Sequence, residues 1–113
     1  METPMTEEEL MTLIKTEMVK VNRDRVYFNL REMKLNRLCE STVDIVSTCV
    51  ALEKLGLPIT SELVSSIRKT GPVSAVATLH GLGDKKVLTL IRGRRRKTLF
   101  WILSDVFKEK MGL

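Results

Sequence analysis

The chain has 113 residues, a hydrophobic fraction of 43% and a formal net charge of +5. That length suits a single domain whose core needs neither a metal nor a disulfide, and no apolar run approaches the roughly 20 residues that span a bilayer. The N-terminus is acidic and lacks the basic region and apolar stretch of a signal peptide, so we expect an intracellular protein.

Two amphipathic helices are expected in the first 40 residues. Thr6 can cap the first helix, because three glutamates fill the turn that follows it and apolar residues recur over 10–21 at a helical period. The polar residues 22–24 break this pattern. The second helix is expected over 25–39, with a wider apolar face that suits neighbours on two sides.

A more apolar helix is expected over residues 41–55. Ser41 and Asp44 have the spacing of a capping box, with Asp in place of the usual Glu. The residues that follow are apolar nearly all round, which is typical of a buried helix. We therefore expect this helix to be central, with Leu52 and Leu55 in the core.

Two short helices follow, each bounded by Gly and Pro. Gly56 can take the left-handed conformation that closes the central helix, and Thr60 or Ser61 can cap the next helix, over 60–69. A second Gly-Pro pair then starts another helix, over 72–82. Short helices packed at steep angles form recognition surfaces more often than catalytic pockets, so this region directs the functional interpretation toward binding.

Residues 84–107 permit two interpretations. Apolar residues continue at a helical spacing, but 87–92 and 98–103 also have the composition of two strands around a basic turn. Periodicity alone does not separate the two. In either case we expect Trp101 to pack in the core, because the chain has few other large side chains.

A dense basic cluster lies within thirteen residues of this region and is opposed only by Asp84. Such a cluster can be a solvated face, can attract an acidic peptide, or can contact nucleic-acid phosphates. No aromatic residue is interleaved, which disfavours stacking on single-stranded bases. The cluster is also a nuclear-localisation candidate. Its members are Lys85, Lys86, Arg92, Arg94, Arg95, Arg96 and Lys97.

Three segments together resemble the N-terminal domain of the transcription elongation factor TFIIS and its integrase-binding-domain-like relatives. The segments are Ala51-Leu-Glu-Lys-Leu, Leu57-Pro-Ile-Thr-Ser-Glu-Leu, and Thr70-Gly-Pro-Val-Ser-Ala-Val-Ala-Thr-Leu followed by Asp84-Lys-Lys-Val. The resemblance covers 41–107. It implies an all-α fold, a compact right-handed bundle of five to six short helices, in one domain over 1–113 with 1–40 as an N-terminal helical extension.

The resemblance also implies a function: a non-enzymatic, monomeric interaction module of nuclear transcription and chromatin proteins that binds short disordered acidic-aromatic motifs. The implied surface joins a loop before the central helix to the turn after helix 72–82, where Leu82 and Val87 are expected to stay partly exposed. The relatives that bind integrase carry an Asp in the first loop, whereas Glu40 and Ser41 stand there in this chain. The peptide-binding candidates are Glu40, Ser41, Thr42, Val43, Leu82, Lys85 and Val87.

A winged-helix DNA-binding domain is the alternative fold and function. In it, helices 60–69 and 72–82 form a helix-turn-helix, and 87–103 forms a β-hairpin whose basic tip enters the minor groove. The difficulty lies in helix 72–82, which offers few side chains that can read base edges. They are Ser74, Thr78 and His80.

Catalysis and metal binding have little support in the sequence. Cys39, Cys49 and His80 are too few and too widely spaced for a zinc site, and they suit helix faces better. The single histidine has no nucleophile or base partner, and no glycine-rich phosphate loop is present. We therefore expect no enzyme activity, no cofactor, no metal and no disulfide.

Overall fold

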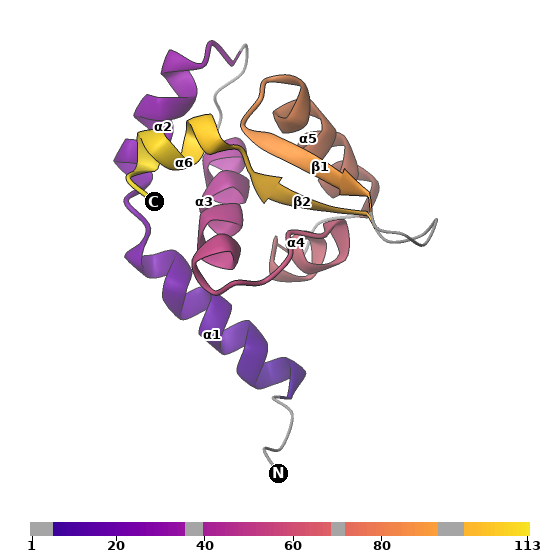
Figure 1. The fold of residues 1–113 in the computed structure, drawn as a ribbon. Coiled ribbons are helices and arrows are strands. Elements are labelled where there is room, and N and C mark those ends of the chain that lie inside the picture. Colours follow the sequence, from indigo (N-terminus) through magenta and orange to yellow (C-terminus); the bar gives the residue numbers. More distant parts are fainter. Residues whose placement is uncertain (1–5, 36–39, 69–71, 93–98) are drawn as a thin grey trace.

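The computed structural model describes residues 6–35, 40–68, 72–92 and 99–113. This part of the chain is mostly helical, as expected, and contains six helices and one small antiparallel sheet (Figure 1). In chain order the elements are α1 Glu7–Lys20, α2 Arg23–Glu32, α3 Glu40–Lys54, α4 Ser61–Arg68, α5 Pro72–Asp84, β1 Leu88–Arg92, β2 Leu99–Leu103 and α6 Asp105–Met111.

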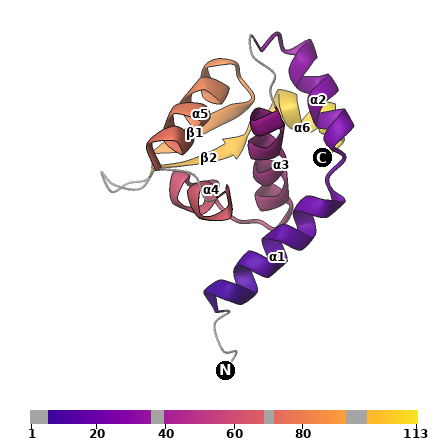
Figure 2. The ribbon, with the colours of Figure 1, turned by 180° about the vertical axis from the view of Figure 1, so that it is seen from behind.

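Helix α3 is the centre of the molecule. It packs against α1, α2, α4 and β2, and nine of its residues are buried. Figures 1 and 2 show α1, α2 and α6 on one side of α3, and α4, α5 and the sheet on the other. The expected core position of Leu52 is confirmed, since it is fully buried, and Leu55 is partly buried against the core.

The first two helices begin at side-chain caps. The Thr6 hydroxyl accepts a hydrogen bond from the Glu9 N–H at 3.2 Å, which confirms the expected start of α1. Helix α2 differs from the expected 25–39. It begins at Arg23, because Asn22 caps it by accepting from the Arg25 N–H, and it ends at Glu32.

The ends of α3 have one expected and one unexpected cause. Gly56, with φ of 72°, closes the helix in a Schellman motif, in which the Leu57 N–H donates to the Leu52 carbonyl at 2.9 Å. At the other end, the chain is already helical at Glu40. The predicted capping box is therefore wrong, because Ser41 and Asp44 both lie inside the helix.

Strands β1 and β2 pair as the two antiparallel strands of a hairpin, which resolves the ambiguity over 84–107 for the described residues. The register pairs Leu88 with Leu103 and Arg92 with Leu99. Ile59 forms an isolated β-bridge to β2, since it exchanges two backbone hydrogen bonds with Trp101. Two helices followed by two antiparallel strands, α4, α5, β1 and β2, are elements that the winged-helix alternative also requires.

Candidate nucleic-acid interface

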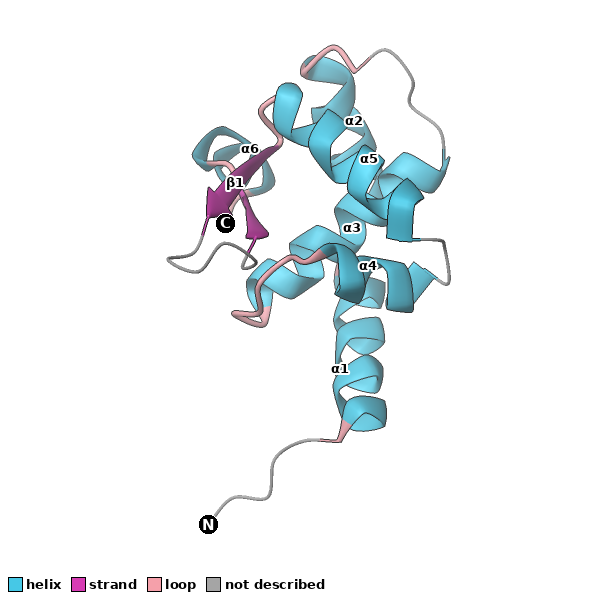
Figure 3. Ribbon diagram, turned by 90° about the vertical axis from the view of Figure 1, so that its right-hand side faces the viewer, coloured by secondary structure: helices cyan, strands magenta, loops and turns pink. Residues whose placement is uncertain are grey.

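The start of α5 lies on the same side of the molecule as the end of β1 and the start of β2, which we call the free ends of the hairpin. Figures 1 and 2 agree on this placement, and Figure 3 looks onto that side, with the hairpin to one side of α4 and α5. The Thr60 hydroxyl fixes the start of α4 by accepting from the Leu63 N–H at 3.1 Å, one of the two caps expected. Helix α4 in turn packs against α5.

Cations lie at both ends of β1. Lys85 and Lys86 precede the strand and Arg92 ends it, and all three are exposed. None of the five ion pairs found in the described ranges includes any of them. The remaining predicted members of the cluster lie outside the described residues, in the segment that joins β1 to β2. They are Arg94, Arg95, Arg96 and Lys97.

The junction between α5 and β1 is a second Schellman motif. Lys86 has φ of 63°, the Lys86 N–H donates to the Gly83 carbonyl, and the Val87 N–H donates to the Leu82 carbonyl at 3.0 Å. This motif usually brings an apolar pair into contact at the positions that Leu82 and Val87 occupy. Leu82 is 2% exposed and Val87 is fully buried. The expectation that these two side chains could receive a partner is therefore wrong.

Ser104 ties the same junction to α6. Its hydroxyl donates to the Lys86 carbonyl at 2.6 Å and accepts from the Phe107 N–H, so it caps α6 while it holds Lys86. The Ser104 N–H donates to the Val87 carbonyl at 3.0 Å. Lys86 is thus an exposed cation on a backbone that is fixed from two sides.

The other half of the predicted peptide surface is the first turn of α3 rather than a loop. Glu40 and Ser41 are exposed, Thr42 is partly buried, and Val43 is buried in the core. Of the seven predicted peptide-binding residues, three are therefore buried and cannot contact a peptide: Val43, Leu82 and Val87.

The outer face of α5 carries no charge until its last residue. Val73, Ser74, Val76, Ala77 and His80 are exposed there, and Val73 is 82% exposed. The hydroxyl of Thr78, the remaining polar candidate, donates to the Ser74 carbonyl at 3.0 Å. The helix can therefore approach a groove, but it has few groups with which to distinguish bases.

Trp101 is in the core, as predicted, and locks the hairpin onto α5. It is 7% exposed, and its ring makes a T-shaped contact with the His80 ring, with ring centroids 5.0 Å apart. A β-carbon on Gly83 would lie 2.6 Å from the Trp101 ring. Because Trp101 and Phe100 are neighbours on a strand, their side chains point to opposite faces of the hairpin.

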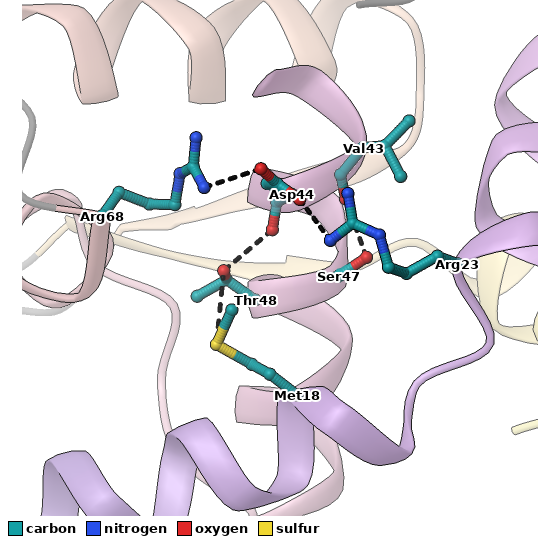
Figure 4. Close-up of polar contacts among 7 residues, drawn as sticks. All are labelled: Met18, Arg23, Val43, Asp44, Ser47, Thr48 and Arg68. Carbon is teal, nitrogen blue, oxygen red and sulfur yellow. Dashed lines mark hydrogen bonds and ion pairs between the residues drawn. The ribbon is translucent and has the colours of Figure 1, made fainter. Parts of the chain in front are cut away.

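A partly buried carboxylate, that of Asp44, links α4 to α3, and sequence reasoning did not find it. Asp44 on α3 forms ion pairs with Arg68 at the end of α4, at 2.8 Å, and with Arg23 at the start of α2 (Figure 4). The Thr48 hydroxyl donates to the Asp44 carbonyl in the same region. The arginines are 21 and 24 residues from Asp44 in the sequence, so no local pattern signals these contacts.

A shallow depression of about 560 Å³ opens beside Lys86. It lies between the end of α5, the hairpin and the start of α6. The apolar side chains of Leu90, Trp101 and Val106 line it, and the carboxylates of Asp84 and Asp105 are part of its wall.

No family model, curated protein or solved structure matches the chain. The resemblance to the TFIIS N-terminal domain therefore stays a prediction. Among the residues that the structure describes, no helix is long and apolar enough to cross a membrane.

Proposed function

We propose that the protein is a non-enzymatic module that binds duplex nucleic acid, with the hairpin making the main phosphate contacts. The observation that carries this proposal is the cation placement. Lys85, Lys86 and Arg92 are exposed, stand at the two ends of β1, and take part in no ion pair of the described residues. Four more cations follow in the sequence that links the strands. Clustered Lys and Arg suffice for phosphate contacts.

The neutral face of α5 sets the kind of recognition. Base-specific binding usually requires Arg, Lys, Asn or Gln side chains that reach base edges, and the exposed face of α5 between Val73 and His80 has none of these. Phosphate contacts carry no sequence information. We therefore infer binding with little sequence preference and steep salt dependence, with a slope of about −6 if all seven cations contact phosphates.

Neutralising three arginines in the sequence between β1 and β2 tests the proposal. The triple variant Arg94→Gln, Arg95→Gln, Arg96→Gln should bind a 20-base-pair duplex more weakly and reduce the salt slope by about three. Fluorescence anisotropy of labelled duplexes across a salt series measures both quantities. The matched control, Lys15→Gln, Lys34→Gln, Lys54→Gln, removes the same charge from exposed positions on α1, α3 and the turn after α2. Equal losses for both triples, or no binding of any duplex, would refute the proposal.

Lys86 offers a sharper test, because its backbone conformation favours glycine. Lys86→Gly relieves the left-handed strain and should leave stability equal or up to about 1 kcal/mol higher, while it weakens duplex binding. Lys34 also has a positive φ, of 59°, and lies outside the cluster. Lys34→Gly should give the same stability change with unaltered binding. If both variants bind duplex equally well, Lys86 makes no contact.

An acidic-aromatic peptide is the second candidate ligand, and the depression beside Lys86 is the observation that favours it. Leu90, Trp101 and Val106 offer an apolar floor for an aromatic side chain, although Asp84 and Asp105 repel flanking acids. Val106→Asp should abolish peptide binding and leave duplex binding intact. The nuclear, transcriptional setting implied by the resemblance belongs to this candidate and stays a prediction.

A further inference from the structure

The outward face of α2 exposes two of the five aromatic residues of the chain. Phe28 is 59% exposed and Tyr27 is 44% exposed. Asp24 and Arg31 lie on the same face, since their spacing from the aromatic pair is three or four residues, and both are exposed. In the part of the chain that the structure describes, neither takes part in an ion pair.

These four residues are self-complementary about a two-fold axis. If a second α2 packs antiparallel with the axis between positions 27 and 28, Tyr27 meets Phe28 of the second copy. The same axis sets Asp24 opposite Arg31, and each contact occurs twice, as a closed symmetric interface requires. A parallel arrangement would instead set like residues against each other.

We propose that two copies of the chain form a dimer through the outward faces of α2. Aromatic residues and Arg are the side chains most enriched in such contacts, and the opposed charges fix the antiparallel register. The inference departs from the monomer expected from the sequence, and it does not rest on nucleic-acid binding. In Figures 1 and 2, α2 lies at the edge of the molecule away from the free ends of the hairpin, so pairing leaves the cations free.

The expected dimer is of moderate affinity. Helix α2 has ten residues, and two such helix faces bury less surface than the roughly 1,600 Å² of a standard interface. We therefore expect dissociation constants in the micromolar range, about 1–100 μM. Sedimentation equilibrium of the full chain, across a range of concentrations on both sides of those values, measures this directly.

Charge exchange across the axis is the decisive experiment. Asp24→Arg alone sets two arginines against each other at each end of the interface and should weaken the dimer at least about tenfold, and Arg31→Asp should do the same with two carboxylates. The double variant, Asp24→Arg with Arg31→Asp, restores opposite charges and should return the dissociation constant to within about threefold of the original.

Aromatic truncation separates this face from general surface stickiness. Phe28→Ala should weaken the dimer about tenfold or more, whereas Val73→Ala, at an even more exposed apolar residue on α5, should leave it unchanged. Circular dichroism of each variant establishes that the fold is retained. A chain that stays monomeric at 500 μM (well above the expected constants), equal effects of the two truncations, or a double variant no better than its single parents would each overturn the proposal.

Discussion

The two sides of α3 use charge differently. On the side of α1, α2 and α6, Lys and Arg hold elements together, since Arg23, Lys108 and Lys110 each form an ion pair with a carboxylate on another helix. On the side of α5 and the hairpin, Lys85, Lys86 and Arg92 are exposed, and the described residues give them no carboxylate partner.

What holds the hairpin side is backbone hydrogen bonding and apolar contact. Ile59 pairs with Trp101, the Val87 N–H bonds to the Leu82 carbonyl, and Ser104 fixes the Lys86 carbonyl. On this side Arg68 of α4 pairs with Asp44, but among the described residues α5 and the hairpin are held without an ion pair. The comparison therefore indicates that the exposed cations beside β1, rather than those that pair helices, are available to bind a ligand.

The largest expected effect comes from the helix that both sides share. Leu52 is fully buried at the point where α3 ends, and Leu52→Ala should cost about 2–5 kcal/mol of unfolding free energy. Urea denaturation followed by circular dichroism measures it, and Lys54→Ala, on the exposed face of the same helix, is the control. A loss below about 1 kcal/mol for Leu52→Ala would mean that the two sides do not depend on a common core.

A smaller effect, confined to the hairpin side, is expected at Gly83. The β-carbon of Gly83→Ala would collide with the Trp101 ring, so we expect a loss of about 1–3 kcal/mol as the hairpin shifts from α5. Gly81→Ala is the matched control in the same helix, because its β-carbon would meet nothing within 4 Å. It should be neutral or stabilising by up to about 1 kcal/mol. Equal results at the two glycines would contradict the proposed packing.

Removing the ion pairs of Asp44, which link the two sides, should have an intermediate to small effect on the free energy of unfolding. Asp44→Ala removes the partner of Arg23 and of Arg68, and we expect about 1–2 kcal/mol, since solvent reaches both arginines in part. Thermal unfolding measures the change. Glu32→Ala, which removes the exposed partner of Lys110, should cost less than about 0.5 kcal/mol. A larger loss at Glu32 than at Asp44 would contradict the expectation that the partly buried carboxylate contributes more to stability than the exposed one.

The Cys49 thiol should react with an alkylating reagent only when α3 is exposed by unfolding. Burial disfavours the charged thiolate and raises the pKa of Cys49 from 9.0 to about 12. A raised pKa means that the thiolate is scarce below that pH in the folded chain, while the unfolded thiol ionises near 9. In a Cys39→Ser background, alkylation at pH 8 should be slow in buffer and fast in urea. Rapid alkylation in buffer would indicate that one side opens independently.

Local signals predicted most of the helix boundaries. Thr6, Gly56 and Thr60 each act within a few residues of their own position, so their roles could be foreseen. The burial of Leu82 and Val87 could not, because it depends on Lys86 in a conformation that usually requires glycine.

Contacts between distant residues were also out of reach. The ion pairs of Asp44 join three helices, and the hairpin was one of two possibilities because its strands contain apolar residues at both spacings. The basic cluster was visible in the sequence, but whether its cations had carboxylate partners depended on the fold. The sequence could therefore locate the basic cluster, but it could not predict whether its cations pair with carboxylates or stay available for a ligand.

The chain has one tryptophan and one tyrosine, and they fall on opposite sides of α3. Trp101 on β2 pairs with Ile59 and contacts His80 of α5, while Tyr27 is exposed on the outward face of α2. Each side consequently has its own intrinsic chromophore. Selective excitation of Trp101 would report on the seating of the hairpin, and the absorbance of Tyr27 would report on the surroundings of α2, without any label.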